Sequence, residues 1–518
     1  MITYIDMELC TVGLLVIILI LTFLYMSMKR AHEFFKRHGI AGPQPARMFG
    51  TFSEYRKKGL LQTDMDLISK YGNVVGIYHG HMPVLLVADP EMIEAICIKH
   101  FDKFRNRKIN LDLGSLLRKT VALSNDGQWR FLRDQISEVF KPIYLKKISG
   151  NLLQSTNHLI SNIEDKLKNE TDFDFQELCL CFSVDSMCNS LFSHNINSYK
   201  DKEDKIVNMI RKGWSAGTVG IARPALACAI CPLMATMFSI FHYNAIPSDV
   251  REFFSQVVTS NMLKRHTDGE QNDLLSFIMK TTRRNSTVEC QNNTARTINN
   301  VSSEYKLSET EMVANCLFFF LAGYDTTAST VVFTLYCLAK NQDCQEQLVK
   351  EIQNNISDTL DDVDKLEYLD MVINESLRIF PTYLRFSRCV QEDIVIKGTK
   401  FCKGTEVSFP VYAIHRNPEY FPDPEKFDPN RFSYLNTSKR NPFSFIPFGV
   451  GQRDCFAQTY AKITVKTAVV ALLQKFRFSL SKKQMDPPPL SKGFYLRPEN
   501  GLWLTVEKRT GDQDVLEL

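Results

Sequence analysis

The sequence has little net charge. Its 62 lysine and arginine residues nearly balance its 58 aspartate and glutamate residues, which leaves a formal net charge of +4 over 518 residues. No basic stripe accompanies this small excess, so the composition argues against a nucleic-acid partner. No internal repeat is apparent, and a content of 44% hydrophobic and 23% charged residues is typical of a globular chain. We therefore expect the partner to be a small molecule or a membrane.

Charge is absent from one long segment near the N-terminus. Residues 9–28, LCTVGLLVIILILTFLYMSM, match the roughly 20 residues that cross a hydrocarbon core of about 30 Å. Acidic residues precede this run and basic residues follow it, which favours an uncleaved anchor over a signal peptide. Because basic flanks stay cytoplasmic, we predict a short lumenal N-terminus at 1–8, a transmembrane anchor at 9–28, a basic and Pro/Gly-containing linker at 29–45 and a cytosolic catalytic domain at 46–518.

The 14 cysteines do not suggest a disulfide framework or a zinc site. A cytosolic domain lies in a reducing compartment, where cysteines are expected to be thiols. The pairs Cys179/Cys181 and Cys228/Cys231 lie in apolar, helical-looking segments, whereas zinc needs four suitably spaced ligands. We interpret both pairs as packing residues.

The chain reads as mainly helical with a smaller β region. Residues 74–91 predict two strands around a turn near Gly80, followed by a helix that Asp89 and Pro90 begin. Residues 128–280 are mostly helical in pattern and contain a second apolar stretch, 225–241, which Pro232 interrupts. We interpret this stretch as inserted into a membrane surface or buried in the core.

Downstream of residue 280, the sequence predicts a loop, a long central helix and a strand pair. Residues 284–303 are rich in Asn, Thr and Ser and predict a flexible loop. Ser308 and Glu311 then form a capping-box pattern at the start of a helix that is apolar on nearly every face, which predicts a helix through the centre of the protein. Residues 393–409 predict a strand pair with a turn at Lys397 and Gly398.

The central helix contains an anomalous stretch, AGYDTT, at residues 322–327. A glycine in a helix interior costs about 1 kcal/mol relative to alanine, and a buried Asp or Thr needs a partner. One explanation is a local opening of the helix that admits water or a ligand to its hydrogen-bond ladder. The other is a kink with satisfied polar residues and no chemistry.

Glu375 and Arg378 are spaced to share one face of a helix in the segment YLDMVINESLRIFP. An exposed pair of this kind contributes little to stability. A buried pair needs a further partner, for which Arg431 is the candidate. We expect these three residues to form a structural network.

The segment FIPFGVGQRDCFAQ, residues 445–458, surrounds Cys455 with residues that shape the backbone. Gly449 and Gly451 permit a close approach to a flat ligand, and a helix beginning near Phe456 would direct its positive end toward Cys455. This environment favours a thiolate, which acts as a nucleophile or as a metal ligand. The 10 histidines show no partner motif for a nucleophile.

These motifs together resemble one family. FGVGQRDC is similar to the haem-binding signature of the cytochrome P450 family, with matches at Phe448, Gly451, Arg453 and Cys455; Ala457 stands where that signature has its last glycine. The resemblance extends over nearly all of the chain. It is strongest to the microsomal clan that holds the vertebrate family-three enzymes and their nematode and insect relatives.

Further motifs carry the same resemblance. Glu375 and Arg378 match the E-x-x-R motif of the family, Arg431 matches its arginine partner, and AGYDTT matches the dioxygen-activating segment of its long central helix. The resemblance therefore implies the cytochrome P450 fold, which is mainly α with a smaller β region, preceded here by the N-terminal transmembrane helix.

The resemblance also implies a cofactor and a set of site residues. Haem b is expected, with Cys455 as the axial ligand of its iron. In that clan the haem propionates are held at the positions of Arg107, Trp129, Arg133, Arg388 and Arg453. Ala322 and Gly323 are expected to leave room for dioxygen. Thr326 is expected to hold dioxygen by a hydrogen bond, and Asp325 to relay protons.

The activity implied by the resemblance is that of a monooxygenase in the endoplasmic reticulum membrane. NADPH would supply electrons indirectly, through a membrane reductase, and cytochrome b5 is a second candidate partner. The substrate would be a lipophilic small molecule, with xenobiotic, steroid and fatty acid all open. Two alternatives remain: a reductase-independent haem-thiolate isomerase or dehydratase, and a non-catalytic haem or lipid-binding sensor. The Asp325 and Thr326 pair argues against the isomerase, which needs no proton relay to dioxygen.

Overall fold

Helices dominate the structure, as the sequence predicts. The computed structural model describes residues 2–107, 114–201, 204–217, 227–228, 232–241, 243–269, 271–280, 307–355 and 360–509. Its longer α-helices are α1 (Ile2–His32), α3 (Phe52–Tyr71), α7 (Asp126–Val139), α9 (Ser149–Lys166), α10 (Phe175–Phe192), α11 (Lys205–Ser215), α13 (Pro232–Ile240), α14 (Ser248–Thr267), α16 (Glu309–Lys340), α17 (Gln342–Asn355), α18 (Glu367–Ile379) and α21 (Gln458–Lys475). The short α-helices are α2 (Phe34–Arg37), α4 (Pro90–Glu94), α5 (Phe101–Phe104), α6 (Ser115–Arg118), α8 (Pro142–Leu145), α19 (Val411–His415) and α20 (Tyr434–Thr437).

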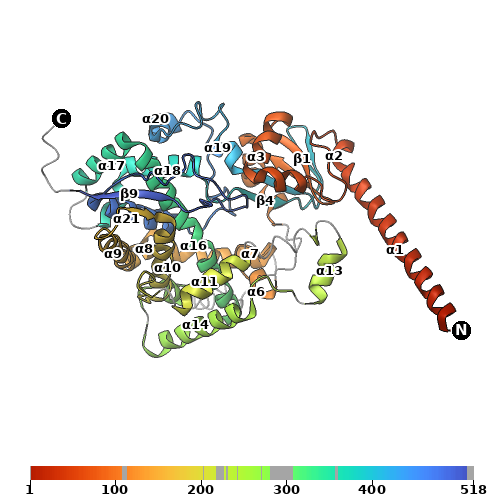
Figure 1. The fold of residues 1–518 in the computed structure, drawn as a ribbon, viewed down its shortest axis with the longest axis horizontal. Coiled ribbons are helices and arrows are strands. Elements are labelled where there is room, and N and C mark those ends of the chain that lie inside the picture. The colour runs from red at the N-terminus through yellow and green to blue at the C-terminus, as the bar shows by residue number, and fades with distance from the viewer. Residues whose placement is uncertain are drawn as a thin grey trace, which may run out of the picture.

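The strands form three small sheets. They are β1 (Val74–His79), β2 (Met82–Val87), β3 (Asp172–Asp174), β4 (Arg385–Cys389), β5 (Ile394–Ile396), β6 (Thr399–Phe401), β7 (Glu406–Pro410), β8 (Phe476–Leu480) and β9 (Trp503–Lys508). The sheet orders are β1-β2-β7-β4, β3-β9-β8 and β5-β6. The four-stranded sheet lies beside α3, on the side of the body from which α1 projects (Figure 1).

Both predicted hairpins are confirmed. The strands β1 and β2 pair antiparallel on either side of the turn at Gly80, and Asp89 then caps α4 by accepting a hydrogen bond from the backbone N–H of Met92 at 3.0 Å. The strands β5 and β6 pair around Lys397 and Gly398, both with positive φ. Such angles are those that a tight hairpin turn requires.

The helix α16 runs through the middle of the molecule, as predicted (Figure 1). The predicted capping box begins it: Glu311 N–H donates to the Ser308 hydroxyl at 3.2 Å, and Ser308 N–H donates to the Glu311 carboxylate at 2.9 Å. In the described part of the chain, α16 is the helix long and apolar enough to span a membrane by length and composition, but 78% of that window is buried in the protein. It is therefore a core helix.

The polar stretch of α16 separates two hydrophobic clusters. Residues up to Tyr324 pack with α7, α10, α11 and α14, whereas residues from Ala328 pack with α18, α21, β8 and β9. The helix is continuous through residues 322–327, so it shows neither the opening of the hydrogen-bond ladder nor the kink that were the two explanations for this stretch. The Thr326 hydroxyl instead donates to the Ala322 carbonyl at 2.6 Å, which satisfies it within the intact helix.

In the second apolar stretch, α13 begins at Pro232, where the missing N–H of proline is harmless. Met237, Ile240 and Phe241 of this region are exposed. The predicted flexible loop at 284–303 lies outside the described residues, as does Cys231.

A buried ion-pair cluster joins α18 to the segment that leads to Cys455. Glu375 and Arg378, each 0% exposed, form two hydrogen bonds of 2.7 and 2.9 Å, and Arg431 lies 3.4 Å from the same carboxylate. The backbone N–H of Asp428 also donates to Glu375, at 2.9 Å. One carboxylate thus balances two guanidinium groups, so the structure brings the three residues of the expected network together.

Replacing Glu375 should destabilise the fold strongly. Glu375→Gln leaves Arg378 and Arg431 buried without a counter-charge, and breaking a buried pair costs about 3–5 kcal/mol. Thermal and denaturant unfolding should show a large loss of stability. The matched control is Asp66→Asn, which removes an exposed partner of Lys58 and should change stability little. Equal effects of the two substitutions would contradict the role of the buried pair.

Candidate active site

The backbone before α21 is folded into a tight loop that ends at Cys455. Gly449 and Gly451 adopt φ of 74° and 78°, which favour glycine, and the Cys455 N–H donates to the Phe448 carbonyl at 2.9 Å. A Cβ on Gly451 would lie 2.3 Å from the Cys97 carbonyl oxygen. Close packing against the protein itself therefore requires Gly451.

Cys455 differs in exposure from the other cysteines of the site-bearing domain. Its side chain is exposed, whereas the other cysteines whose side chains the structure describes are buried or half-buried. The surrounding protein nevertheless raises the pKa of the Cys455 thiol to about 11 by desolvation, an effect partly offset by the N–H of Ala457. A thiol in this setting needs a cationic partner to become a thiolate.

One face of α16 borders the same region. Ala322, Gly323 and Thr326 are half-exposed in a stretch of helix whose other residues from Phe319 to Val332 are buried. Thr326 shares a helix face with both Ala322 and Gly323, because it follows them by four and three residues. Thr326 and Phe448 also line one small pocket. The central helix and the cysteine loop therefore bound a common space.

Asp325 is the charged residue of that helix segment. It is 1% exposed, and its Oδ1 has no hydrogen-bond partner within the described chain. Burial raises the pKa of Asp325 to about 6, against a smaller opposing effect of Arg497. Asp325 and Thr326 form no side-chain hydrogen bond with each other within the described chain; the Thr326 hydroxyl donates to the Ala322 carbonyl instead.

Gly323 has a packing role as well. A Cβ there would lie 3.1 Å from the sulfur of Met187 on α10, and the Gly323 carbonyl accepts a hydrogen bond from the Ser183 hydroxyl at 2.9 Å. The glycine thus permits close packing of α10 against α16. The helix–helix contact alone accounts for the small residue, independently of any ligand.

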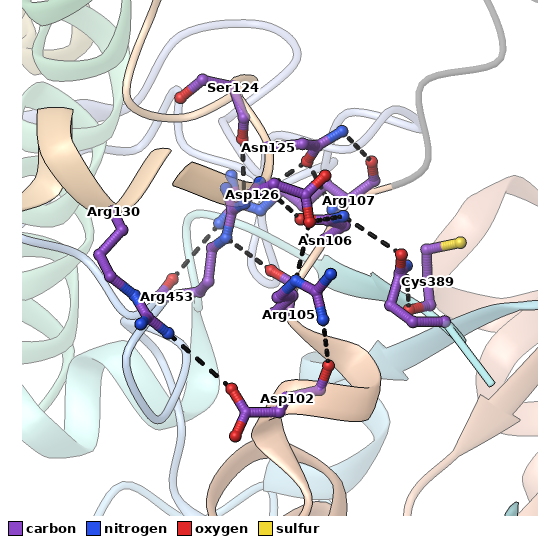
Figure 2. Close-up of polar contacts among 11 residues, drawn as sticks. Asp102, Arg105, Asn106, Arg107, Ser124, Asn125, Asp126, Arg130, Cys389 and Arg453 are labelled. Carbon is purple, nitrogen blue, oxygen red and sulfur yellow. Dashed lines mark hydrogen bonds and ion pairs between the residues drawn. The ribbon is translucent and has the colours of Figure 1, made fainter. Parts of the chain in front are cut away.

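Arg453 joins the cysteine loop to the segment before α7. Its Nε donates to the Arg105 carbonyl and one terminal nitrogen donates to the Ser124 carbonyl, both at 2.9 Å, as Figure 2 shows. Its guanidinium carbon lies 4.1 Å from the ring centroid of Trp129. The other terminal nitrogen, Nη1, is buried without a partner in the described chain.

Arg107 and Arg388 complete a cluster of buried cations. Arg107 donates to the carbonyls of Ala122 and Arg453 at 3.1 and 3.4 Å, and Arg388 donates to the Val450 carbonyl at 3.2 Å. The Nε atoms of both are buried without partners in the described chain. Burial, together with the neighbouring guanidinium groups, lowers the pKa of Arg453 to about 8 and that of Arg388 to about 10.

Arg133 differs from the other expected propionate residues. Its guanidinium donates to the Asp454 carbonyl at 2.6 Å and also pairs with the Asp454 carboxylate. Its charge is therefore already balanced by the residue next to Cys455. The structure places Trp129 beneath Arg453, so the aromatic face supports the cation.

A polar network that the sequence analysis missed holds the Arg453 partners in place (Figure 2). Asn106 and Asp126 exchange two hydrogen bonds, Asn106 Nδ2 to Asp126 Oδ1 at 2.9 Å and Asp126 N–H to Asn106 Oδ1 at 3.0 Å. Arg105 Nε donates to the same carboxylate at 2.7 Å. The Cys389 N–H donates to the Asn106 carbonyl at 2.7 Å, which links β4 to this network. A single sequence carries no signal for such contacts between distant segments.

His415 is a second residue that the sequence analysis missed. Its Nε2 accepts a hydrogen bond from the Ile446 N–H at 2.9 Å, and its carbonyl accepts one from Arg378 at 3.0 Å. Burial lowers the pKa of His415 well below its usual value, which keeps Nε2 free to accept. His415 therefore connects the Glu375 cluster directly to the cysteine loop.

The residues fit the haem that the sequence predicts. Haem offers an iron that takes a thiolate and two propionate carboxylates. The described site offers one exposed thiol and three buried guanidinium groups that each retain an unpaired nitrogen. Buried cations require an anionic partner. Cys455, Arg107, Arg388 and Arg453 would therefore hold the group.

Replacing Asp325 should stabilise the protein at neutral pH. Because the pKa is raised from 3.8 to about 6 in the folded state, the fold binds this proton more tightly than the unfolded chain does. The contribution of the Asp325 carboxyl to the free energy of unfolding is therefore greatest at low pH, and it is lost as the pH rises through about 6. Asp325→Asn should gain roughly 3 kcal/mol near pH 7. The gain should shrink on acidification in thermal unfolding; a gain independent of pH would contradict this account.

Comparison with known proteins assigns the chain to a family. The family model described as Cytochrome P450 matches residues 40–505. Similar proteins include Cytochrome P450 3A6 of Oryctolagus cuniculus, 32% identical over 498 residues, which are 95% of this chain and 96% of that protein. Cytochrome P450 3A9 of Rattus norvegicus is 33% identical over 502 residues, 96% of each chain. Cytochrome P450 3A5 of Homo sapiens is 32% identical over 503 residues, again 96% of each.

The match of the family model therefore spans most of the chain, and the similarity to these relatives spans nearly all of it. The protein belongs to the cytochrome P450 family and is a monooxygenase that uses haem with a cysteine thiolate ligand and electrons derived from NAD(P)H through a reductase.

Proposed function

We propose that this enzyme inserts one oxygen atom of dioxygen into a lipophilic small molecule, with NADPH as the indirect electron source. The observation that carries the proposal is the exposed Cys455 thiol beside three buried guanidinium groups with unpaired nitrogens. When bound, the haem supplies the activation of dioxygen. The protein holds that group, positions the substrate and moves protons.

Cys455 is the proposed axial ligand of the haem iron. The hydrogen bond from its own N–H to Phe448 and the positive φ of Gly451 hold the loop in one conformation. The N–H of Ala457 hydrogen-bonds to the Cys455 side chain and favours its negative charge. Bound iron would favour the thiolate much more strongly, as metals do with coordinating thiols.

The propionates are proposed to bind the cation cluster. Arg107, Arg388 and Arg453 each have an unpaired nitrogen, and Trp129 orients Arg453 through its ring face. Arg133 is proposed to act through Asp454 and not to contact a propionate itself. Its pairing with Asp454 fixes the residue that precedes Cys455.

Asp325 and Thr326 are proposed to manage protons on the α16 side. The pKa of Asp325, about 6, lies close enough to neutral pH for the carboxyl both to release and to regain a proton. Because the Thr326 hydroxyl donates its proton to Ala322, its lone pairs face outward as acceptors. The half-exposed Ala322 and Gly323 would leave space for dioxygen beside it.

We also propose that α1 anchors the enzyme, as a single span, in the endoplasmic reticulum membrane with the domain from residue 46 on the cytosolic side. The helix projects from the body (Figure 1) and exposes large apolar side chains, namely Val12, Leu14, Leu15, Ile18, Leu19, Phe23, Tyr25 and Met26. Lys29, Arg30 and His32 occupy its last turn. The helix α13, whose Met237 and Ile240 are exposed, lies on the same side of the body as α1 (Figure 1), which supports contact of α13 with the membrane surface.

The redox partners are proposed to dock on the cysteine side of the site. Arg130 of α7 is exposed there, where it pairs weakly with Asp102 at 3.8 Å. A membrane reductase, with cytochrome b5 as a second candidate, would present an acidic surface to it. The proposed substrate is a lipophilic xenobiotic, steroid or fatty acid.

Removing the Cys455 thiol should abolish the spectroscopic signature of a haem-thiolate. Cys455→Ala leaves no thiolate for the iron, so the red-shifted Soret band of the reduced carbon monoxide complex should disappear. Cys402→Ala, which alters a half-buried cysteine in another segment, should keep the band. Persistence of the band in Cys455→Ala would contradict the ligand assignment.

Removing the Thr326 hydroxyl should uncouple the reaction. Thr326→Ala should retain haem and consume NADPH, but product per NADPH should fall several-fold while hydrogen peroxide rises, because proton delivery is no longer controlled. Thr334→Ala is the matched control, since its hydroxyl makes the same type of bond to a carbonyl one helical turn back, at 2.7 Å. Unchanged coupling in Thr326→Ala would show that the proposed role is wrong.

A further inference from the structure

A row of four aromatic side chains crosses the region between α16 and the cation cluster. Tyr324 meets Trp214 of α11 with ring centroids 6.1 Å apart, and Trp214 meets Tyr495 at 4.8 Å. Tyr495 in turn meets Tyr383 at 5.2 Å. The four residues come from four separate segments of the chain.

The backbone holds Tyr383 and Tyr495, the two tyrosines at one end of the row, close together. Tyr383 and Tyr495 pair as an isolated antiparallel β-bridge. On either side of it, Leu384 N–H donates to the Phe494 carbonyl and Leu496 N–H donates to the Thr382 carbonyl, both at 2.9 Å. The two phenol rings are therefore fixed relative to each other and to β4, which follows Tyr383.

The row connects the α16 segment that contains Asp325 with the guanidinium of Arg107. Tyr324 directly precedes Asp325 in α16, so one end lies at the proposed proton relay. At the other end, Tyr383 and Tyr495 both interact electrostatically with the guanidinium of Arg107. Trp214 and Tyr324 are buried, so a substrate would contact Tyr383 and Tyr495, beside the arginine proposed to hold a haem propionate.

The hydroxyl groups of Tyr383 and Tyr495 are unpaired. Neither hydroxyl forms a hydrogen bond to any residue that the structure describes. Neither oxygen is among the fully buried polar atoms that lack a partner, so both are still accessible to a ligand. Tyr383 is 38% exposed and Tyr495 is half-buried, so neither hydroxyl is sealed in the core. Tyr324 differs, because its hydroxyl interacts with Arg211.

We propose that Tyr383 and Tyr495 are specificity-determining residues that select lipophilic substrates carrying an acceptor oxygen, such as a carbonyl, over the corresponding hydrocarbons. The inference rests on the proposed function and narrows its substrate class. Aromatic faces favour packing with a flat apolar body, and two fixed phenol groups add hydrogen-bond donors directed at one part of that body. A pure hydrocarbon leaves both donors desolvated and unpaired, which weakens its binding.

The phenols are suited to donate and not to ionise. Burial raises the pKa of both Tyr383 and Tyr495 above the usual value. Both hydroxyls therefore stay protonated across the physiological range. The nearby Arg107 donates as well, but the proposed haem propionates occupy it.

The test compares two probes of the same shape on the intact haem protein. Acetylnaphthalene carries a carbonyl where ethylnaphthalene carries a methylene, so the pair isolates one acceptor oxygen. Their dissociation constants are measured by Soret titration and by calorimetry for wild type, Tyr383→Phe, Tyr495→Phe and the double variant. Each substitution keeps the ring and removes only the hydroxyl. The matched control is Tyr434→Phe, which alters an exposed ring in α20.

Wild type should prefer the ketone, and each tyrosine variant should lose roughly two- to tenfold in affinity for the ketone alone. The hydrocarbon should bind the variants as well as, or better than, it binds wild type, and Tyr434→Phe should match wild type. Equal losses for both probes, or no loss for either, would overturn the inference. The carbon monoxide spectrum is recorded on every variant. If the variants retain the thiolate band and also keep the preference for the ketone, the tyrosine roles alone are refuted. If wild type lacks the band, the proposed function is refuted.

Discussion

Buried positive charge is the constraint on which the active site depends. The Arg107 guanidinium lies close enough to lower the pKa of both Arg388 and Arg453, and Arg388 lowers that of Arg453; Arg388 and Arg453 are buried and Arg107 is half-buried. Backbone carbonyls satisfy part of their hydrogen-bonding capacity, but carbonyls are neutral and cannot cancel the charge. The described residues around the cluster leave three nitrogens unpaired, so the fold is completed only by an anionic ligand. The two propionates of haem meet that requirement, and binding the group therefore contributes to stability as well as to catalysis.

The rest of the molecule holds this cluster opposite the cysteine loop. The Asn106 and Asp126 pair fixes the carbonyls that Arg453 contacts, and His415 ties the buried Glu375 cluster to the backbone of Ile446. On the far side, α16 is anchored in two separate hydrophobic clusters. Its polar segment lies between them, where Asp325 and Thr326 can border the site without disrupting either core. The strong packing of the helix on both sides explains why it stays continuous through a glycine and two threonines.

Local patterns in the sequence predicted much of this arrangement. The capping box at Ser308, both hairpins and the mainly helical class follow from short-range rules, and the structure confirms them. The sequence predicted that Gly449 and Gly451 shape the backbone around Cys455, and the structure shows positive φ at both. The spacing of Glu375 and Arg378 predicted a shared face, but only the fold shows that both are fully buried.

Other features depend on contacts between distant segments, for which one sequence has no signal. Arg133 is paired with Asp454, and Gly451 is required by the Cys97 carbonyl; neither follows from spacing. His415 and Asn106 act through backbone groups far away in the chain, and the row from Tyr324 to Tyr383 joins four segments.

The central claim is that the arginine cluster is balanced by the carboxylates of the bound cofactor. It is tested most directly by reconstituting haem-depleted protein with haem or with haem dimethyl ester, whose propionates are uncharged, and measuring the affinity of each by optical titration. The account predicts that the ester binds far more weakly, because esterification leaves three buried guanidinium groups without a counter-charge. Equal affinity for the two would contradict it.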